Sequence, residues 1–469
     1  MVLVDPRLRR VVNSGTWADR LADFLISAYA SRIPDEVLER AALQMLDSVA
    51  CAAGAHGSGP VRIAVESIAE VKGGEATVWF EKRSATVGDA VLANGTAVRY
   101  LDANDVFLGV GPGGHPSDNI PVAVAAAERF GSSGRDLLAA IAIAYELVYR
   151  LRTHVYRQTP LGPQWHEVSI SGLVASVITA LLGNANPSQL TEAIRIGASR
   201  GYTLREVRRG RISMLKASAN AIVARDGVMS GLLALNGMTG PEKIFEGKDG
   251  LVETFGGTPD EAMIDSLCAP PTWSILRVSI KPYPAFGTSQ AAITAAVACA
   301  GRIAAQDVIQ RVEVRLRDSP WTHDYMSLEE RRHPQTRETA DHSLHFLVAI
   351  ALIDGEVGER HYEGRCWERS DVQDLMSKIE IVPDPALGRS GSSFPAEVVV
   401  GVDRGDSVSE KVDRVPGSPE DPWGAPEVTS KFHRIDQVGL SRARMGEIAA
   451  EALALVSARN VLRLTSLIE

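Results

Sequence analysis

The amino-acid sequence predicts a mainly α-helical fold with a smaller α+β second domain, and three observations support this prediction. Apolar residues recur three and four positions apart through most of the chain up to about Ala269. Between that point and residue 412, apolar and charged residues alternate in several short runs. The 469 residues also exceed the roughly 250–300 that one hydrophobic core usually holds, so we expect two or more domains.

The first part of the chain is expected to be a large helical domain. Several of its segments are apolar nearly all round, which is typical of helices buried among other helices rather than of a shell around a sheet. Turn-forming residues separate them, as at 184–188 and 237–242. The expected helices cover residues 37–52, 89–100, 120–129, 137–151, 169–182, 189–198 and 217–236.

The pattern changes near Cys268, which is followed by Ala269 and two prolines. Val312, Val314 and Leu316 alternate with charged residues, as in a half-buried strand. This middle part is therefore expected to be a compact α+β domain. Its expected elements are helices at 290–304 and 343–353 and further strands at 379–382, 396–402 and 408–412.

The last part of the chain becomes helical again after a proline- and glycine-rich link at residues 415–426. We expect a helix at 447–456 that packs back against the first domain. The predicted organisation is therefore a helical domain at 1–268, a small α+β domain at 269–428 and a helical return at 429–469.

Composition narrows the functional classes. The chain has 49 Lys and Arg against 58 Asp and Glu, a net charge of −9, which argues against a general nucleic-acid binder. Its apolar segments are too short or too interrupted by charge to span a membrane, and the N-terminus does not resemble a secretory signal. The four cysteines show no disulfide or zinc spacing, so we expect reduced thiols and a cytoplasmic protein.

The segment 204–216 (LREVRRGRISMLK) is a basic cluster in this acidic chain. Arginine binds carboxylates through two parallel hydrogen bonds, and a partly desolvated lysine can also transfer protons. The cluster therefore indicates an anion site, and a solvated face or inter-domain salt bridges are the alternatives. Its cations are Arg205, Arg208, Arg209, Arg211 and Lys216, against the one acid Glu206, a local excess of 5 − 1 = +4.

A glycine-rich run at residues 109–114 formally matches GxGxxG. No clear strand precedes it and Pro112 interrupts it, so we do not expect a dinucleotide-binding loop. The run more plausibly presents His115 just before a helix, where anions are favoured. Asp102 and Asp105, just upstream, could orient this histidine or move a proton, and a purely structural histidine is the alternative.

Other candidates are His166, for which a buried structural histidine is the alternative, and Lys281 at the expected domain boundary, for which an exposed strand-end lysine is the alternative. His342 and His345 lie three apart, but neither an HExxH motif nor enough further ligands accompany them, so we expect no metal site. No GxSxG motif supports a nucleophilic serine. The candidates favour proton transfer beside a carboxylate without a cofactor.

Six segments together resemble the MmgE/PrpD family, which includes 2-methylcitrate dehydratases, cis-aconitate decarboxylases and an iminodisuccinate epimerase. They occur in the family's order and cover nearly the whole chain. The segments are RYLDAND (99–105), GHPSDNIP (114–121), ISMLKASANAIVARDGV (212–228), GMTGP (237–241), IKPYPAFGTSQAA (280–292) and PQTRETADHSLHFLVAIALIDG (334–355).

The resemblance implies a large helical domain built from both termini, an inserted α+β domain and a homodimer. It also implies an active site in the cleft between the domains that uses no metal or organic cofactor. Carried over by motif, the catalytic positions are Asp102, His115, His166, Lys216 and Lys281. The residues expected to contact a small carboxylic acid substrate are Arg205, Arg208, Tyr283, Ser289 and His345.

Within the family, GHPSDN and YPAFGTSQ resemble the dehydratase branch more than the decarboxylase branch, which usually carries YPCCRYTH. The sequence therefore favours dehydration of a 2-methylcitrate-like hydroxy acid by proton abstraction and loss of hydroxide. Val106 and Phe346 depart from the family pattern by lacking a hydroxyl group, and His345 replaces a proline. The alternatives are a cis-aconitate-like decarboxylase, an epimerase of an amino or imino dicarboxylate, and an inactive binding homologue.

Overall fold

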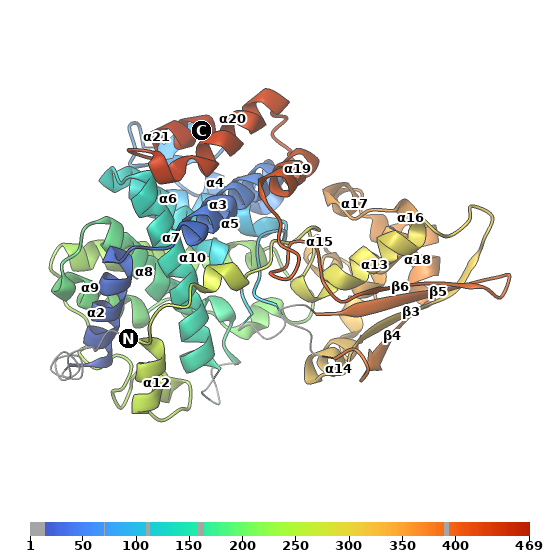
Figure 1. Cartoon of the computed structure of the whole chain (residues 1–469), viewed down its shortest axis with the longest axis horizontal. Helices are drawn as coiled ribbons and strands as arrows, with labels where there is room; N and C mark the ends of the chain where they lie inside the picture. Colours follow the sequence, from blue (N-terminus) through green and yellow to red (C-terminus); the bar gives the residue numbers. More distant parts are fainter. Residues whose placement is uncertain (1–14, 70, 109–112, 158, 160–163, 389–393) are drawn as a thin grey trace.

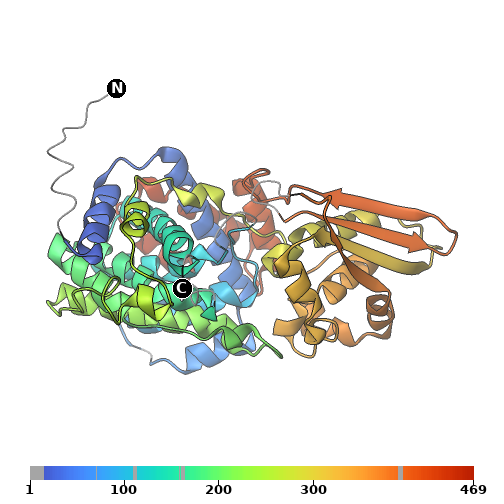
Figure 2. The same cartoon turned by 90° about the horizontal axis from the view of Figure 1, so that it is seen from below.

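The structure is a computed structural model that describes residues 15–69, 71–108, 113–157, 159, 164–388 and 394–469. It has two bodies side by side along the longest axis, a large helical body and a smaller body that contains a sheet (Figure 1). The C-terminal helices lie on the helical body, so the small body is an insertion between two helical parts (Figure 2). This confirms the predicted mainly α fold with a smaller α+β part.

The helical body contains every helix expected in the first part of the chain, with ends within three residues of the prediction. A short hairpin of β1 (Ala76–Val78) and β2 (Arg83–Ala85) lies beside them. The main helices are α2 (Trp17–Ala30), α3 (Asp35–Ala55), α4 (Gly59–Glu66), α5 (Val87–Tyr100), α6 (Ile120–Phe130), α7 (Gly134–Arg150), α8 (Ser171–Leu182), α9 (Pro187–Ala198), α10 (Leu215–Leu235), α11 (Leu251–Thr254) and α12 (Glu261–Leu267).

Helix α10 packs against α5, α8 and α9 and carries Lys216 in its first turn. It approaches α8 closely, because Gly227 faces the backbone of Gly172. A Cβ atom on Gly227 would lie only 2.3 Å from the Gly172 carbonyl oxygen, so a larger residue would push the two helices apart. This close approach fixes the position of α10 and therefore the place of Lys216.

The small body is built on a four-stranded sheet of order β4-β3-β5-β6. The strands are β3 (Ile309–Arg317), β4 (Ile379–Asp384), β5 (Ala396–Val402) and β6 (Ser407–Val412). Strand β3 runs parallel to β4 and antiparallel to β5, with Val314 opposite both Ile381 and Val398. The alternation predicted for β3 is confirmed, because Val312, Val314 and Leu316 are fully buried while residues between them are not.

Helices cover the sheet of the small body. Helix α13 (Gln290–Ala300) packs on β5 and β6, and α16 (Leu344–Asp354) packs on α13 and β4. Helix α13 ends four residues earlier than the predicted 290–304, at the C-cap Gly301. The other helices are α14 (Pro320–Met326), α15 (Arg337–Ala340), α17 (Glu359–Glu363) and α18 (Ser370–Ser377).

The two bodies have separate apolar cores. The first core continues through Ile280 and resumes at Val428, whereas the second runs from Ala285 to Val415. The chain therefore crosses from one body to the other just after Lys281. The boundaries given above, after residues 268 and 428, stay predictions.

The C-terminal return consists of α19 (Ala425–Ile435), α20 (Arg442–Leu453) and α21 (Leu462–Leu467). A buried ion pair holds α19 against α3, with Lys431 Nζ 2.6 Å from Asp47 Oδ1. The same ammonium donates to the carbonyl oxygen of Ala103 at 2.7 Å. The end of the chain thus supports the turn next to Asp102, although 328 residues separate Lys431 from Ala103.

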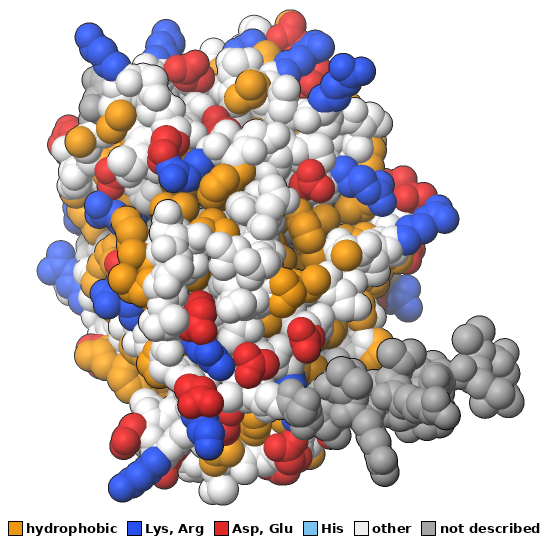
Figure 3. Space-filling model, turned by 90° about the vertical axis from the view of Figure 1, so that its left-hand side faces the viewer, with side chains coloured by type: hydrophobic (Ala, Val, Ile, Leu, Met, Phe, Trp, Pro, Cys, Tyr) orange, Lys and Arg blue, Asp and Glu red, His pale blue; other side chains and the backbone are white. Residues whose placement is uncertain are grey.

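Charges of both signs are mixed on the face of the helical body shown in Figure 3, with apolar side chains between them. Within the part of the chain that the structure describes, every helix is too short or too polar to cross a bilayer. The four cysteines are all free thiols.

Candidate active site

The cluster of predicted site residues lies where the two bodies meet, around the carboxylate of Asp102. Asp102 follows the end of α5 with a left-handed backbone, φ 53°, which aspartate tolerates better than most residues. Its Oδ1 atom lies 2.5 Å from Lys281 Nζ and 3.0 Å from Arg99 Nη1, and its Oδ2 atom lies 3.0 Å from Lys216 Nζ. Arg99 and Asp102, which are three residues apart, therefore form one buried charge cluster with Lys216 and Lys281, which are distant in sequence.

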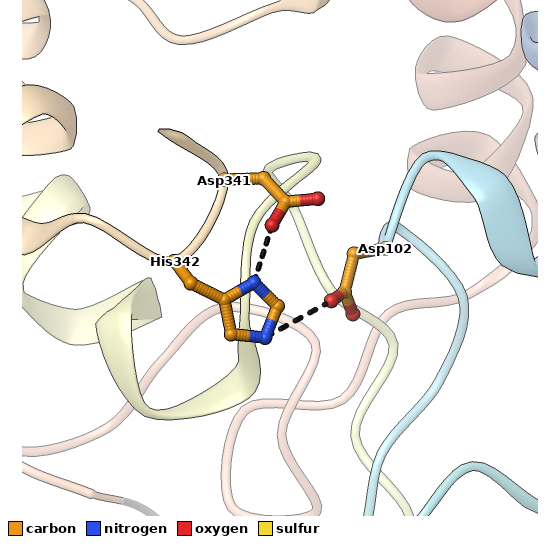
Figure 4. Close-up of side chains that lie close together, drawn as sticks. All are labelled: Asp102, Asp341 and His342. Carbon is orange, nitrogen blue, oxygen red and sulfur yellow. Dashed lines mark hydrogen bonds and ion pairs between the residues drawn. The ribbon is translucent and has the colours of Figure 1, made fainter. Parts of the chain in front are cut away.

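The small body adds Asp341 and His342, which lie in the turn between α15 and α16. Lys216 Nζ donates to Asp341 Oδ2 at 2.7 Å, so this ammonium links a carboxylate from each body. Figure 4 shows the His342 ring between the two carboxylates. Its Nδ1 atom contacts Asp341, and its Nε2 atom lies 3.7 Å from Asp102 Oδ2.

Arg337 holds the Asp341 carboxylate in place. It donates to Asp341 Oδ2 at 2.8 Å and to both carboxylate oxygens of Glu359 at 2.7 and 3.0 Å. Such paired hydrogen bonds to a carboxylate are both strong and directional. Asp341 is therefore held between two cations, Arg337 and Lys216, and has one fixed position.

The electrostatics of the cluster keep both acids ionised. Burial alone would raise the pKa of the Asp102 carboxyl, but the charges of Arg99, Lys216 and Lys281 hold it well below its usual range. Burial would also raise the pKa of Asp341, but Lys216 and the contact with His342 lower it.

Burial acts in the opposite sense on the bases of the cluster. It lowers the pKa of Lys281 to about 8, although Asp102 opposes this shift. It also lowers the pKa of Lys216, against the attraction of Asp102 and Asp341. Burial and the Lys216 charge together lower the pKa of His342 to about 3, so this imidazole is neutral at physiological pH.

The hydrogen bonds of His115 fix which ring nitrogen carries its proton. Nδ1 lies 2.5 Å from the backbone carbonyl oxygen of Asp105, which can only accept, so Nδ1 is the donor. Nε2 then has the lone pair and accepts from Arg99 Nη2 at 3.1 Å. Asp105 also accepts from the Ser117 hydroxyl at 2.5 Å, which holds the His115 loop in place. We expect an upstream aspartate to orient His115, and Asp105 contacts the ring through its backbone carbonyl oxygen rather than its carboxylate.

In His166 the hydrogen-bonding roles of the two ring nitrogens are the reverse of those in His115. The Nδ1 atom of His166 accepts from the backbone N–H of Val168 at 3.2 Å, so Nε2 carries the proton when the ring is neutral. In His342, Nδ1 faces the carboxylate of Asp341 and Nε2 accepts from Arg208 Nη2 at 2.9 Å. The three histidines thus offer two accepting Nε2 atoms, on His115 and His342, and one donating Nε2 atom, on His166.

A cavity of about 480 Å³ lies between the bodies beside this cluster, and we call it the main cavity. A narrow continuation of about 20 Å³, which shares His115, His166 and Arg208 with it, reaches Lys216. Among the described residues that line the main cavity, one is acidic, Asp324, and seven are arginines. These arginines are Arg152, Arg157, Arg205, Arg208, Arg209, Arg317 and Arg331.

The structure brings most of the predicted site residues to this place. His115, His166, Arg205 and Arg208 line the main cavity, and Lys216 lines its continuation. Asp102 and Lys281 lie behind them as fully buried members of the charge cluster.

Three residues expected to contact substrate lie elsewhere. Tyr283 lines a different cavity of about 520 Å³ beside Pro284. The hydroxyl of Ser289 is fully buried and donates to the Phe286 carbonyl oxygen at 2.7 Å. His345 is buried within α16, where burial lowers its pKa to about 4. The structure therefore gives these residues no direct contact with the main cavity.

His342 is not among the predicted catalytic residues, because its spacing from His345 indicates only a possible metal ligand. The available signal was the adjacent carboxylate in the Asp341-His342 pair. An aspartate next to a histidine does not by itself contact the ring. The turn between α15 and α16 brings them together here.

Asp102, Asp341 and His342 offer three ligand atoms within 4.8 Å of one another, the spacing of a metal site. Lys216 Nζ, however, lies 3.0, 2.7 and 3.4 Å from an atom of each of them in turn. The ammonium occupies the position that a metal ion would need, and Lys281 and Arg99 add two further positive charges. The donor set therefore fits a lysine-centred ion cluster better than a metal centre.

Comparison with known proteins identifies two family models and several relatives. The MmgE/PrpD N-terminal domain matches residues 19–263, and the MmgE/PrpD C-terminal domain matches residues 283–455. A cis-aconitate decarboxylase-like protein oryM of Aspergillus oryzae is 25% identical over 97% of each chain. A cis-aconitate decarboxylase of Aspergillus terreus is 24% identical over 94% of this chain and 91% of its own. A 2-methylcitrate dehydratase of Cupriavidus necator is 26% identical over 63% of this chain and 62% of its own.

The low pKa of His342 predicts a pH-dependent stability. The unfolded chain binds a proton on this histidine below its ordinary pKa of 6.5, whereas the folded protein does so only near pH 3. The stabilisation is therefore complete above pH 6.5 and is lost as the pH falls toward 3. Between pH 7 and pH 5 the free energy of unfolding of the wild type should fall by about 2 kcal/mol because of this group. The fall for His342→Gln should be smaller by the same amount.

Urea unfolding of both proteins at pH 7 and pH 5 measures this difference. His323→Gln is the control, because His323 is 60% exposed and lies outside the cluster. An equal loss of stability in the wild type and in His342→Gln would contradict the neutral, buried state of His342.

Proposed function

This chain belongs to the MmgE/PrpD family, and we propose that it is a lyase that acts on a small polycarboxylic acid. The observation that carries the proposal is a cavity with seven arginines and one acid beside two histidines of opposite hydrogen-bonding polarity. Arginine and lysine can hold several carboxylates at once, while an accepting and a donating imidazole supply a base and an acid.

The finer proposal is dehydration of a 2-methylcitrate-like hydroxy acid. Arg208 and Lys216 pair with substrate carboxylates, and the same cations stabilise the negative charge that develops on a carboxylate when the α-hydrogen leaves as a proton. Several buried cations face few anions at the edge of the cavity, so charge stabilisation there is strong.

His115 is the proposed base and His166 the proposed acid. An incoming carboxylate competes for Arg99 and leaves the Nε2 lone pair of His115 to take the α-hydrogen. The electron pair of the broken C–H bond first moves onto the adjacent carboxylate, and it forms the alkene when the C–O bond then breaks. His166 gives its Nε2 proton to the departing hydroxide, which leaves as water, so His166 becomes an imidazolate and His115 an imidazolium. One proton then passes from His115 to His166 through solvent, and both rings are neutral again. Asp102 positions Lys216 and Arg99 through direct ion pairs, and Lys281 in turn holds Asp102.

Decarboxylation of a cis-aconitate-like acid is the second candidate. The relatives that match this chain over more than nine tenths of its length carry that name, although their identity is only 24–25%. The same cations would bind the acid, and the carbon that loses carbon dioxide would be protonated by a histidine. The two reactions are distinguished by their products.

We also propose that the protein forms the homodimer expected from the family resemblance, and that two copies meet along α10. Leu215, Ile222 and Met229 are spaced seven residues apart on this helix and are 46%, 46% and 55% exposed. Ile63 on the adjacent α4 extends this apolar stripe and is 48% exposed. An exposed apolar stripe of this kind is typical of a protein interface.

Product analysis tests the proposed reaction. Purified protein with a chelator should form alkene from 2-methylcitrate without carbon dioxide. Lys216→Met should lower turnover at least about a hundredfold, because it removes a cation that stabilises the developing charge. Lys243→Met, on the exposed surface, should retain full turnover. Release of carbon dioxide from cis-aconitate would show that the reaction is decarboxylation and not dehydration. The absence of any product from 2-methylcitrate, cis-aconitate and citrate would contradict the lyase proposal.

Hydrogen exchange separates the two histidines. In deuterated water, His166→Asn should still exchange the substrate α-hydrogen while it loses dehydration by about a hundredfold or more, because the base remains and the acid is gone. His115→Asn should lose both exchange and dehydration. Mass spectrometry of recovered substrate measures the exchange. The assignment fails if His115→Asn exchanges the hydrogen as fast as the wild type.

Sedimentation velocity tests the dimer. The wild type should have twice the mass of one chain, and Ile222→Lys should shift it toward one chain by placing a charge in the apolar stripe. Val308→Lys is the control, because Val308 is similarly exposed (51%) but lies on the small body. A wild type that sediments as a single chain would contradict the proposed interface.

A further inference from the structure

A row of aromatic rings leads outward from the charge cluster across the small body. His342 stacks on Phe286 with ring centroids 5.2 Å apart, and Phe286 stacks on Tyr325 at 5.7 Å. Tyr325 stacks on Trp321 at 5.3 Å, and Trp321 meets Phe394 edge to face at 5.0 Å. We call Phe286, Tyr325, Trp321 and Phe394 the aromatic row. It begins beside His342, which contacts Asp341, and ends at Phe394, where the Arg317 guanidinium lies 4.8 Å from the ring centroid.

All four rings of the aromatic row line the main cavity, as does Leu328. The opposite side of the same cavity, from the helical body, carries Arg152, Arg205 and Arg208 together with His115. The small body also contributes Arg317 and Arg331, and the helical body also contributes Tyr156 and Trp165, so each wall has both cations and rings. The aromatic row is the continuous run of four rings on the small-body wall. A ligand that filled it would need carboxylates at one part and apolar surface at another.

The helical body adds apolar surface next to the first ring of the row. Val106 and Leu108 line the main cavity beside Gly287. A Cβ atom on Gly287 would lie 2.8 Å from Leu108 Cδ2 and 3.2 Å from a Val106 methyl carbon, so the three residues are in close contact. Val106 and Leu108 therefore present methyl groups to the main cavity beside Gly287.

The amount of apolar lining exceeds what a methyl substituent can use. A single methyl group covers part of one ring, whereas the aromatic row offers four rings in sequence. A cavity of about 480 Å³ also lies within the range of roughly 300–1,000 Å³ that holds drug-sized ligands, which are larger than a seven-carbon acid.

We propose that the substrate carries, besides its carboxylates, an apolar alkyl or arylalkyl substituent several carbons longer than methyl, which lies along the aromatic row. This inference rests on the proposed function in that it takes the ligand to be a polycarboxylic acid. The carboxylates bind at Arg208 and Lys216, and the substituent extends from His342 past Phe286 toward Trp321.

Binding of unreactive analogues tests the substituent without relying on turnover. Tricarballylate and its 2-methyl, 2-butyl and 2-hexyl derivatives, numbered as 3-carboxypentanedioates so that the alkyl group is on the same carbon as the methyl group of 2-methylcitrate, lack the hydroxyl group that dehydration removes. Calorimetry gives their affinities. Each buried methylene should strengthen binding about three- to fourfold, so the five methylenes that distinguish the 2-hexyl acid from the 2-methyl acid should strengthen binding about two hundredfold or more. Trp321→Ala should remove most of this gain and change the affinity for the 2-methyl acid less than twofold.

Trp423→Ala is the matched control, because Trp423 is also half-buried but lines the other cavity, beside Tyr283. It should leave the dependence on chain length unchanged. Equal or falling affinity along the series overturns the inference and leaves the polycarboxylate lyase intact. No binding by any member overturns both, and a chain-length effect that survives Trp321→Ala and Phe394→Ala overturns the placement along the aromatic row.

Discussion

The ammonium of Lys216, held between the carboxylates of Asp102 and Asp341, is the interaction on which the rest of this structure depends. One carboxylate belongs to the helical body and the other to the small body, so this contact ties the two bodies together at the candidate active site. Removing such charges from water costs several kcal/mol each, and only a nearly complete set of partners offsets that cost. Arg99, Lys281 and Arg337 complete the set and explain why so many charged residues lie buried at one place.

The same cluster prepares the site for its proposed chemistry. It leaves an excess of positive charge at the edge of the main cavity, where a polycarboxylate would neutralise it. Fixed neighbours also set the protonation of each histidine: the backbone oxygen of Asp105 for His115, and the backbone N–H of Val168 for His166. The proposed base and acid are therefore oriented before substrate binds, which is how enzymes avoid reorganisation during the reaction.

Local patterns in the sequence predicted the secondary structure well, because buried helices and the alternating strand β3 carry strong periodic signals. The charge cluster was predicted in part, since Asp102, Lys216 and Lys281 stand in recognisable motifs. Tyr283, Ser289 and His345 stand in the same motifs but lie elsewhere, because neighbours in an irregular segment or on a helix do not face the same side. The pairing of Lys431 with Asp47 spans 384 residues and depends on how α19 packs on α3, which no local pattern contains.

The central claim is that the Lys216 cluster and the main cavity form the binding site for a polycarboxylate. A crystal structure of the protein with bound tricarballylate tests it most directly. One carboxylate should lie within hydrogen-bond distance of Lys216 Nζ or Arg208, with the methylene carbons facing His115 Nε2. Tricarballylate bound in the cavity beside Tyr283, with the main cavity holding only water, would contradict it.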